Sequence, residues 1–333
     1  MICRKLSNNK KYLIFAYVIL FFLFIISLLI GRYPQAGLLP INVLLHDHLA
    51  QELIINLRLP RVISGLVLGI SLSLSGLVMQ TSFQNPLVEP GFLGVSQGAA
   101  FGASVAIVFI GNSNISIQIL AIIFGLLGLI LSIWISSKIR FGGYILRLVL
   151  AGIAVSAFFS AGIGIIKYMA DPIKQLPDIV FWLLGGLWTV RWEDLTYILP
   201  VIVSGILLIY LLRWRLNVYT LSSDVAYSLG VNKKSENFLM LIVAVIMTAA
   251  IISISGIVSW VGLVIPNMAR SISGPDTARA VPMTIAMGGI FVLICDDLAR
   301  TLLAGEIPLS IFTALFGAVI FIFMISIKKG SLV

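Results

Sequence analysis

Long apolar runs separated by short polar segments dominate this chain. A helix needs about 20 apolar residues to cross a hydrocarbon core of roughly 30 Å. By that measure the sequence predicts ten spanning helices, over residues 12–30, 62–81, 93–110, 117–136, 145–169, 195–212, 238–254, 257–272, 281–303 and 309–327. The first run is longer than the apolar core of a secretory signal and lacks a cleavage pattern, so we interpret it as a span. The pattern predicts an all-α, polytopic membrane protein forming one domain over 1–333.

The apolar stretch 238–265 could be one long helix, or two helices that meet near Ser253, Ser255 and Gly256. Cytoplasmic loops of membrane proteins are enriched in Lys and Arg. With ten spans and a cytoplasmic N-terminus, 15 of the 22 basic residues are cytoplasmic. The seven outside are Arg32, Arg58, Arg61, Lys167, Lys174, Arg191 and Arg300. Merging the two helices would leave 11 of the 22 on each side. Charge therefore favours ten spans, with both termini on the cytoplasmic side. We expect the location to be a prokaryotic cell (inner) membrane.

Composition supports lipid as the solvent for this chain. It is 60% hydrophobic and 11% charged, which is more apolar surface than one soluble core could bury. The net charge of +9 sits in short loops that orient spans, so we predict no nucleic-acid partner. Cys3 and Cys295 indicate neither a disulfide framework nor a metal site.

Small residues recur at every fourth position in several predicted spans. Residues at that spacing share one helix face, which lets neighbouring backbones approach closely. We interpret them as packing positions, with a direct contact to substrate in a pathway as the alternative. They are Gly65, Gly69 and Ser73, then Gly94, Gly98 and Gly102, and then Gly152, Ser156, Ser160 and Gly164.

Two segments outside the spans have distinct patterns. The external segment 171–192 contains Trp182, Trp188 and Trp192 and predicts a short interfacial helix with aromatic anchors. The cytoplasmic segment 213–237 is the longest connection on its side. Within it, Ser or Asp residues can cap a short helix that Gly230 ends, which is typical of a docking element.

The chain lacks the motifs of a catalyst. It has no G-x-x-x-x-G-K-[ST] loop, no H-E-x-x-H and no C-x-x-C, so we assign no catalytic, cofactor or metal residues. His46-Asp47-His48 could hold a metal, but a solvated loop is the ordinary interpretation. No acidic residue lies mid-span in the first eight spans, which argues against a proton-coupled or sodium-coupled carrier. Asp296, Asp297 and Arg300 form either an interfacial ion pair or part of a docking surface.

Several motifs closely resemble the FecCD-type permease family of ABC importers, in family order from about Leu57 to Phe323. They are Leu57-Arg58-Leu59-Pro60-Arg61, Gly76-Leu77-Val78-Met79-Gln80, Asn85-Pro86-Leu87-Val88-Glu89-Pro90-Gly91, Trp182-Leu183-Leu184-Gly185-Gly186, Leu229-Gly230-Val231, Gly262-Leu263-Val264-Ile265-Pro266, Asp297-Leu298-Ala299-Arg300 and Glu306-Ile307-Pro308. One departure is Asn267, where the family usually has His. We therefore do not transfer a substrate from any single relative.

The resemblance implies a ten-helix subunit, itself not an enzyme, that pairs with a second permease copy or a paralogue. Two cytoplasmic ATP-binding cassette subunits would bind ATP and Mg and drive alternating access, and an extracytoplasmic protein would deliver substrate. Matching positions for binding-protein docking are Arg58, Arg61 and Arg300; simple anchoring of the second span is the alternative for the first two. Matching positions for ATPase coupling are Ser223, Asp224, Val225, Ala226, Leu229 and Gly230.

The expected substrate is an iron-siderophore, haem or cobalamin-type metal chelate. An importer of the same fold for an oxyanion such as molybdate is the first alternative. A carrier that works without ATP would need midplane carboxylates or paired repeats, and a membrane-embedded enzyme would need a reactive constellation within the spans. Neither pattern is present in this sequence.

Overall fold

The computed structural model describes residues 2–33, 35, 37–111, 113–303 and 305–327, and it does not describe the side chains of residues 2–9, 41, 223 and 234. Of the basic residues counted as cytoplasmic, Lys328 and Lys329 lie outside the described residues. The side chains of Arg4, Lys5 and Lys234 also lie outside them.

The described chain is helical apart from one short antiparallel pair of strands, in which Ile30 pairs with Leu38. The elements are α1 (Ile2–Leu29), β1 (Ile30–Gly31), β2 (Gly37–Leu38), α2 (Ile41–His46), α3 (His48–Leu53), η1 (Ile54–Arg58), α4 (Leu59–Phe83), η2 (Pro90–Leu93), α5 (Val95–Val105), η3 (Ala106–Ile110), α6 (Asn114–Lys138), α7 (Tyr144–Met169), α8 (Gln175–Leu184), α9 (Trp192–Leu211), α10 (Arg215–Val218), α11 (Ser223–Ser228), α12 (Lys233–Ser255), α13 (Val261–Ser273), α14 (Thr277–Thr301) and α15 (Leu309–Ile327).

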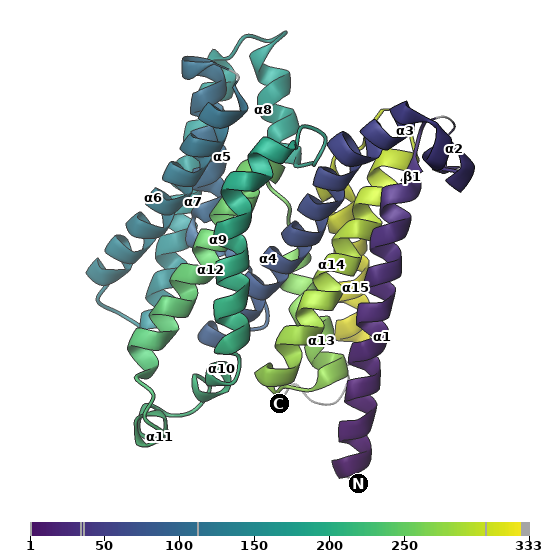
Figure 1. The fold of residues 1–333 in the computed structure, drawn as a ribbon. Coiled ribbons are helices and arrows are strands. Elements are labelled where there is room, and N and C mark those ends of the chain that lie inside the picture. The colour runs from purple at the N-terminus through teal and green to yellow at the C-terminus, as the bar shows by residue number, and fades with distance from the viewer. Residues whose placement is uncertain (1, 34, 36, 112, 304, 328–333) are drawn as a thin grey trace.

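Eight helices in the described part of the chain are long and apolar enough to cross a membrane. They cover residues 10–29, 48–83, 114–138, 144–169, 192–211, 235–255, 277–301 and 309–326. Two shorter helices, the continuous helix Val95–Ile110 and α13, run alongside them (Figure 1). The predicted all-α polytopic fold is therefore confirmed. We call the end where α1 begins and α15 ends the terminal face, and the opposite end the distal face.

The stretch 238–272 is broken where its serines and glycine predict a break. Helix α12 ends at Ser255, and Gly256 follows with φ +66°. The predicted helix 257–272 starts too early, because residues 257–260 form a loop in which Trp260 adopts φ +73°. Helix α13 then has only 13 residues, or about 20 Å at 1.5 Å per residue, which is less than a full crossing.

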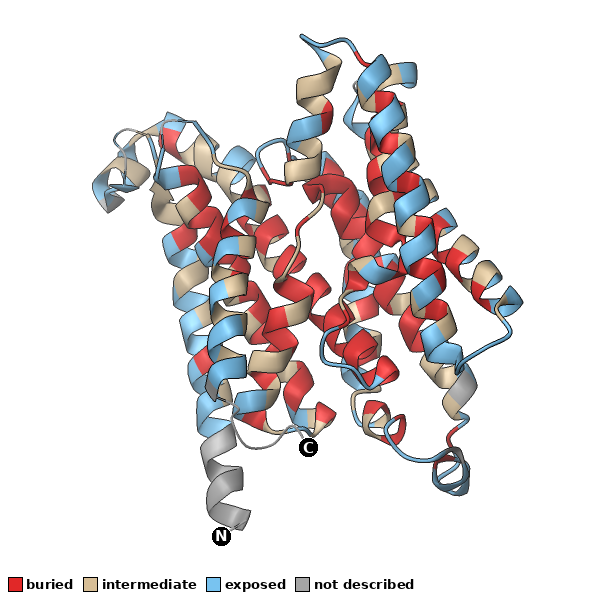
Figure 2. Cartoon of the chain, turned by 180° about the vertical axis from the view of Figure 1, so that it is seen from behind, coloured by how far each residue is buried: buried red, intermediate tan, exposed pale blue. Residues whose placement is uncertain are grey.

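Helix α4 is the centre of the molecule. Of its 25 residues, 21 are buried, and it contacts α1, α9, α12, α13 and α14. Buried residues gather in the middle of the bundle, whereas exposed ones follow the outer helices (Figure 2). Many exposed residues on those outer helices are large and apolar, including Phe22, Phe158 and Phe323. Such surfaces fit contact with lipid rather than water.

The two patterned segments outside the spans both contain helices. Helix α8 lies within the external segment 171–192, near the distal face (Figure 1). Helices α10 and α11 lie within the segment 213–237, at the terminal face. The last five residues of that segment already belong to α12, because Asn232 caps this helix by accepting from the backbone N–H of Ser235.

Candidate docking and coupling sites

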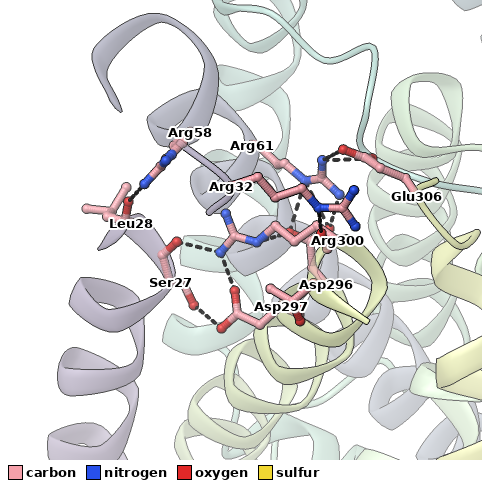
Figure 3. A network of polar contacts seen from close by, with 10 residues as sticks. Ser27, Leu28, Arg32, Arg58, Arg61, Asp296, Asp297, Arg300 and Glu306 are labelled. Carbon is pink, nitrogen blue, oxygen red and sulfur yellow. Dashed lines mark hydrogen bonds and ion pairs between the residues drawn. The ribbon is translucent and has the colours of Figure 1, made fainter. Parts of the chain in front are cut away.

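The distal end of α14 carries three buried charged side chains. Asp296, Asp297 and Arg300 are 1%, 8% and 7% exposed, and the helix turns them toward α1 and α4 (Figure 3). Buried charges are stable only when they are paired and hydrogen-bonded. The partners of this cluster therefore decide what it can do.

Arg61, in the first turn of α4, joins the cluster to the loop between α14 and α15. Its Nη2 lies 2.9 Å from Oδ1 of Asp296, and its Nη1 lies 2.8 Å from Oε1 of Glu306 (Figure 3). The Asp296 side chain is 2% exposed, whereas that of Glu306 is 39% exposed. Arg61 thus has one buried carboxylate partner and one that water can reach.

Arg300 ties α14 to the end of α1. Its guanidinium donates to the carbonyl oxygen of Ser27 and pairs with Asp297, and Asp297 accepts a 2.6 Å hydrogen bond from the Ser27 hydroxyl. The guanidinium is therefore enclosed by polar partners within the molecule. A docking contact through Arg300 would require this cluster to open.

Arg58 differs from Arg61 and Arg300 because its described hydrogen-bond partners are backbone carbonyl oxygens. Its guanidinium donates to the carbonyl oxygens of Leu28, Leu29 and Tyr33 at 3.2–3.3 Å, and so caps the end of α1. Among the described ion pairs, Arg58 has no carboxylate partner. In total, four arginines lie in this region with the three carboxylates of Asp296, Asp297 and Glu306; they are Arg32, Arg58, Arg61 and Arg300, of which Arg58 points toward Leu28 (Figure 3). The cluster has an excess positive charge, which favours an acidic partner.

The loop beside this cluster uses Asp47 for structure. Asp47 accepts a 2.6 Å hydrogen bond from the Tyr33 hydroxyl and caps α3 through the backbone N–H of Leu49. The Tyr33 hydrogen bond holds the pKa of Asp47 below its ordinary value. No group of three metal-binding side chains occurs among the described residues, and in His46-Asp47-His48 the central carboxylate is engaged in these contacts.

The segment proposed to meet the ATPase forms two short helices at the terminal face. Asn217 bonds to Asp276 at 2.8 Å and Arg215 pairs with Glu236 at 2.7 Å, so α10 is fixed to the starts of α14 and α12. In α11, Ala226 is fully buried, whereas Val225 is 46% exposed.

The residues that follow complete this surface. Leu229 is 59% exposed, Asp224 is exposed, and Gly230 ends the turn with φ +74°. The side chain of Ser223 lies outside the described residues. Helix α11 therefore has one side against the bundle and an apolar side that faces outward, as a docking helix requires.

Several of the small residues predicted to pack helices lie at close approaches, but Ser160 and Gly164 are exposed, and a Cβ on Gly164 would meet no atom within 4 Å, so the packing prediction is wrong for these two. A Cβ on Gly69, Gly98 or Gly152 would collide with the backbone of α14, α6 and η2 respectively. Gly94 caps α5 with φ +78°. Around Gly65, a Cβ would find ordinary contacts at 3.4 Å.

Ser156 has a different setting from the glycines. It lines a cavity of about 440 Å³ together with Glu89 and Thr248. It is therefore placed where either of the two interpretations, helix packing or contact with a passing substrate, could apply.

A family model, described as the FecCD transport family, matches residues 19–327 of this chain. The chain belongs to the FecCD transport family. This FecCD chain is 37% identical to the molybdate import system permease protein MolB of Haemophilus influenzae, over 92% of this chain and 93% of MolB. It is 34% identical to the hemin transport system permease protein HmuU of Yersinia pestis, over 81% of this chain and 82% of HmuU.

A solved structure agrees with this assignment. An inward-facing conformation of a metal-chelate type ABC transporter matches with a TM-score of 0.86 and 35% identity, covering 95% of this chain and 99% of that one. This FecCD chain is a permease subunit of an ABC importer and a multi-pass membrane protein.

Sequence reasoning did not find every member of the distal cluster of this FecCD permease. Glu306 was visible only as part of the Glu306-Ile307-Pro308 motif, which gave no sign of its pairing with Arg61. Ser27 lies inside an apolar run and carried no signal, although it contacts both Asp297 and Arg300. These partners become neighbours only when α1 packs against α14.

Proposed function

We propose that this chain moves a metal chelate of the iron-siderophore, haem or cobalamin type across the cell membrane. It would act with a second permease copy or paralogue, two ATP-binding cassette subunits and a substrate-binding protein. The observation that carries the proposal is the likeness, over nearly the whole chain, to permeases of such importers. The basic residues favour a cytoplasmic terminal face, which makes the distal face external.

The distal cluster supports docking of an acidic binding protein. Arg58 brings a charge that no described carboxylate neutralises, and Arg offers carboxylates a forked, charge-assisted contact. Arg61 can take part by exchange, because a carboxylate of the partner can replace the water-accessible Glu306 while buried Asp296 keeps the guanidinium oriented. Arg300 acts from within the cluster, where it holds α1 against α14.

The apolar side of α11 supports coupling to an ATPase. Val225 and Leu229 would bury their side chains in a groove of the nucleotide-binding subunit. Motion of that subunit would then reach α10 and, through Arg215 and Asn217, the starts of α12 and α14. A connected set of rigid elements of this kind suits alternating access.

An oxyanion importer is the second candidate, and the likeness to MolB favours it. The cavity that Ser156 lines favours a shielded cargo instead. Of the described residues around that cavity, Glu89 carries the only charged side chain. A doubly negative oxyanion would meet an acidic side chain there, whereas a chelate without net negative charge would not be repelled by it.

The test is uptake into liposomes that contain the chain with its ATPase and binding protein. Iron chelate, haem, cobalamin and molybdate are compared side by side, with and without ATP. We expect ATP-dependent uptake of one chelate, and a loss of uptake in an Arg58→Glu/Arg61→Glu variant. Lys174→Glu, an exposed charge reversal remote from the cluster, is the matched control.

Two results would overturn the proposal. Uptake that needs no ATPase would indicate a carrier. Selective uptake of molybdate would replace the metal chelate by the oxyanion as the substrate.

A further inference from the structure

A cavity of about 850 Å³ lies near the terminal face, apart from the distal cluster. It is bounded by the end of α4, the start of α7, the residue that follows α10 and the first turns of α12. Nothing in the transport mechanism proposed above uses it. Its volume is many times the roughly 30 Å³ that one water molecule occupies in the liquid.

Three buried polar atoms on the wall of this cavity have no hydrogen-bond partner. They are Oγ of Ser82, the hydroxyl oxygen of Tyr219 and Oδ1 of Asn237. Ser82 is 5% exposed and Tyr219 is 1% exposed, so both side chains are more than nine-tenths buried. Buried polar groups in folded proteins are nearly always satisfied, and an unsatisfied group is unfavourable. Two donors and one acceptor that share a cavity indicate a ligand with complementary groups.

The electrostatic setting at the same wall favours an anion. Asn232, Lys233 and Ser235 line the cavity at the N-terminus of the 23-residue helix α12, where the backbone N–H groups and the helix dipole attract negative charge. The ammonium of Lys233 donates to the carbonyl oxygen of Leu221 at 2.5 Å, which leaves its charge unneutralised. The nearby carboxylate of Glu236 is paired with Arg215.

Tyr219 remains a donor in this setting. Burial raises the pKa of Tyr219 to about 12, so its hydroxyl keeps its proton at neutral pH. The Ser82 hydroxyl can also donate a hydrogen bond, at every ordinary pH. Two hydroxyl donors thus stand beside a helix N-terminus and a lysine.

The remaining wall of the cavity is apolar. Tyr144 and Ile145 from the start of α7 face Phe238 and Leu241 from α12. Tyr144 is 45% and Phe238 is 41% exposed, so this wall reaches the surface of the molecule. A ligand that fills the site needs an anionic end with hydrogen-bonding groups and an apolar body.

We propose that this cavity binds an anionic phospholipid whose headgroup carries free hydroxyls. The phosphate accepts hydrogen bonds from Ser82 and Tyr219 beside the N-terminus of α12, and a headgroup hydroxyl donates to Asn237. An acyl chain lies along Tyr144 and Phe238. Because the site lies between the start of α7 and the start of α12, which follows α11 in the chain, an occupied site stiffens the region through which α11 is attached to the bundle.

Binding of single lipids to the purified full chain in detergent tests this assignment. Native mass spectrometry gives the dissociation constant of the first lipid bound, for phosphatidylglycerol and for phosphatidylcholine with the same acyl chains. Glycerol 1-phosphate tests the headgroup alone. We expect phosphatidylglycerol to bind at least about tenfold more tightly than either of the others, because hydrogen bonds to a charged group are the strong ones.

Two variants and two controls connect binding to this cavity. Ser82→Ala/Tyr219→Phe removes both donors and should weaken phosphatidylglycerol about tenfold or more. Gly143→Trp should block the site, because a Cβ on Gly143 meets no atom within 4 Å and the backbone there suits any residue. Ser71→Ala removes a buried, unpartnered hydroxyl outside the cavity, and Tyr197→Phe removes an exposed one; both should bind as the wild type does.

Each other outcome overturns the proposal. Equal binding of the two phospholipids would remove the anion preference, and tight binding of glycerol 1-phosphate would make this a site for a soluble metabolite. Unchanged affinity in both variants would place the lipid elsewhere. If the double variant does not fold, Gly143→Trp decides alone, provided that its melting temperature matches that of the wild type.

Discussion

Arg61 divides its guanidinium between a carboxylate that water cannot reach and one that it can. The bond to Asp296 is part of the interior, whereas the bond to Glu306 is a part-exposed ion pair of the kind that contributes little to stability. An arginine arranged in this way keeps its orientation when the exposed partner leaves. In the proposed docking of a binding protein, Glu306 is therefore the residue that would compete with the partner for Arg61.

Glu306→Gln should strengthen docking of the binding protein. The substitution removes the carboxylate that competes for Arg61, at a cost no greater than that of an exposed ion pair. We expect the affinity for the binding protein to rise about threefold at low salt, with a smaller gain at high salt, when measured by surface plasmon resonance.

Glu52→Gln is the control for this change, because Glu52 is an exposed acid near the same face whose one ion pair among the described residues is with His48, at 3.5 Å. An affinity that is unchanged or weaker in Glu306→Gln would show that Glu306 does not compete with the partner.

The three arginines illustrate what the sequence could predict about the site. Motif positions identified Arg58, Arg61 and Arg300 as docking candidates, but they did not predict which partners surround each guanidinium group. The environments of Arg58 and Arg300 depend on where α1 ends, since carbonyl oxygens at that end accept hydrogen bonds from both guanidinium groups. Contacts between residues about 270 positions apart are products of packing, which a local pattern does not contain.

At the scale of elements, the approach of α4 to α14 depends on a glycine. Gly69→Ala should destabilise the protein, because the new methyl group would collide with the carbonyl oxygen of Gly288, a backbone atom that cannot move aside. We expect a loss of about 1–3 kcal/mol, as for other overpacked cores. Thermal unfolding in detergent measures it.

Gly65→Ala, one turn earlier on the same helix, is the matched control. Its methyl group would make contacts of ordinary length, and alanine favours a helix. Equal melting temperatures for Gly65→Ala and Gly69→Ala would contradict the packing role assigned to Gly69.

Helix α11 presents a second test at this scale. Leu229→Ser should weaken binding of the ATPase subunit about tenfold, because the free energy of burying a leucine side chain would be lost. Co-purification at graded concentrations measures this, with Ser228→Ala as the control on the neighbouring residue. Equal retention of the ATPase by both variants would exclude the apolar side of α11 as the contact.

The sequence predicted elements best where composition alone decides them. The long apolar runs and the break after Ser255 were visible as patterns. The short length of α13 was not, because residues 257–260 are as apolar as a helix would be. Trp260 leaves the helical region at φ +73°, and its ring packs against Gly317 and Phe321 of α15. This packing contact outweighs the preference of residues 257–260 for a helical conformation.

At the scale of the whole molecule, the proposed cytoplasmic position of the terminal face predicts which residues reagents can reach. In a Cys3→Ser background, where Cys295 is fully buried, His48→Cys should react with an impermeant maleimide in intact cells. Ser228→Cys, in the coupling segment, should react only after the membrane is opened. Labelling of both from outside, or of Ser228→Cys alone, would contradict the proposed orientation.

Helix α1 begins and α15 ends toward the same face of the bundle, the terminal face (Figure 1). A gene duplication that joined two such chains in tandem would need only a polar linker between them. Both halves would keep their orientation, and the linker would never enter lipid. The fold is thus permissive to becoming a single polypeptide with two non-identical halves, each free to diverge at its own distal and terminal surfaces.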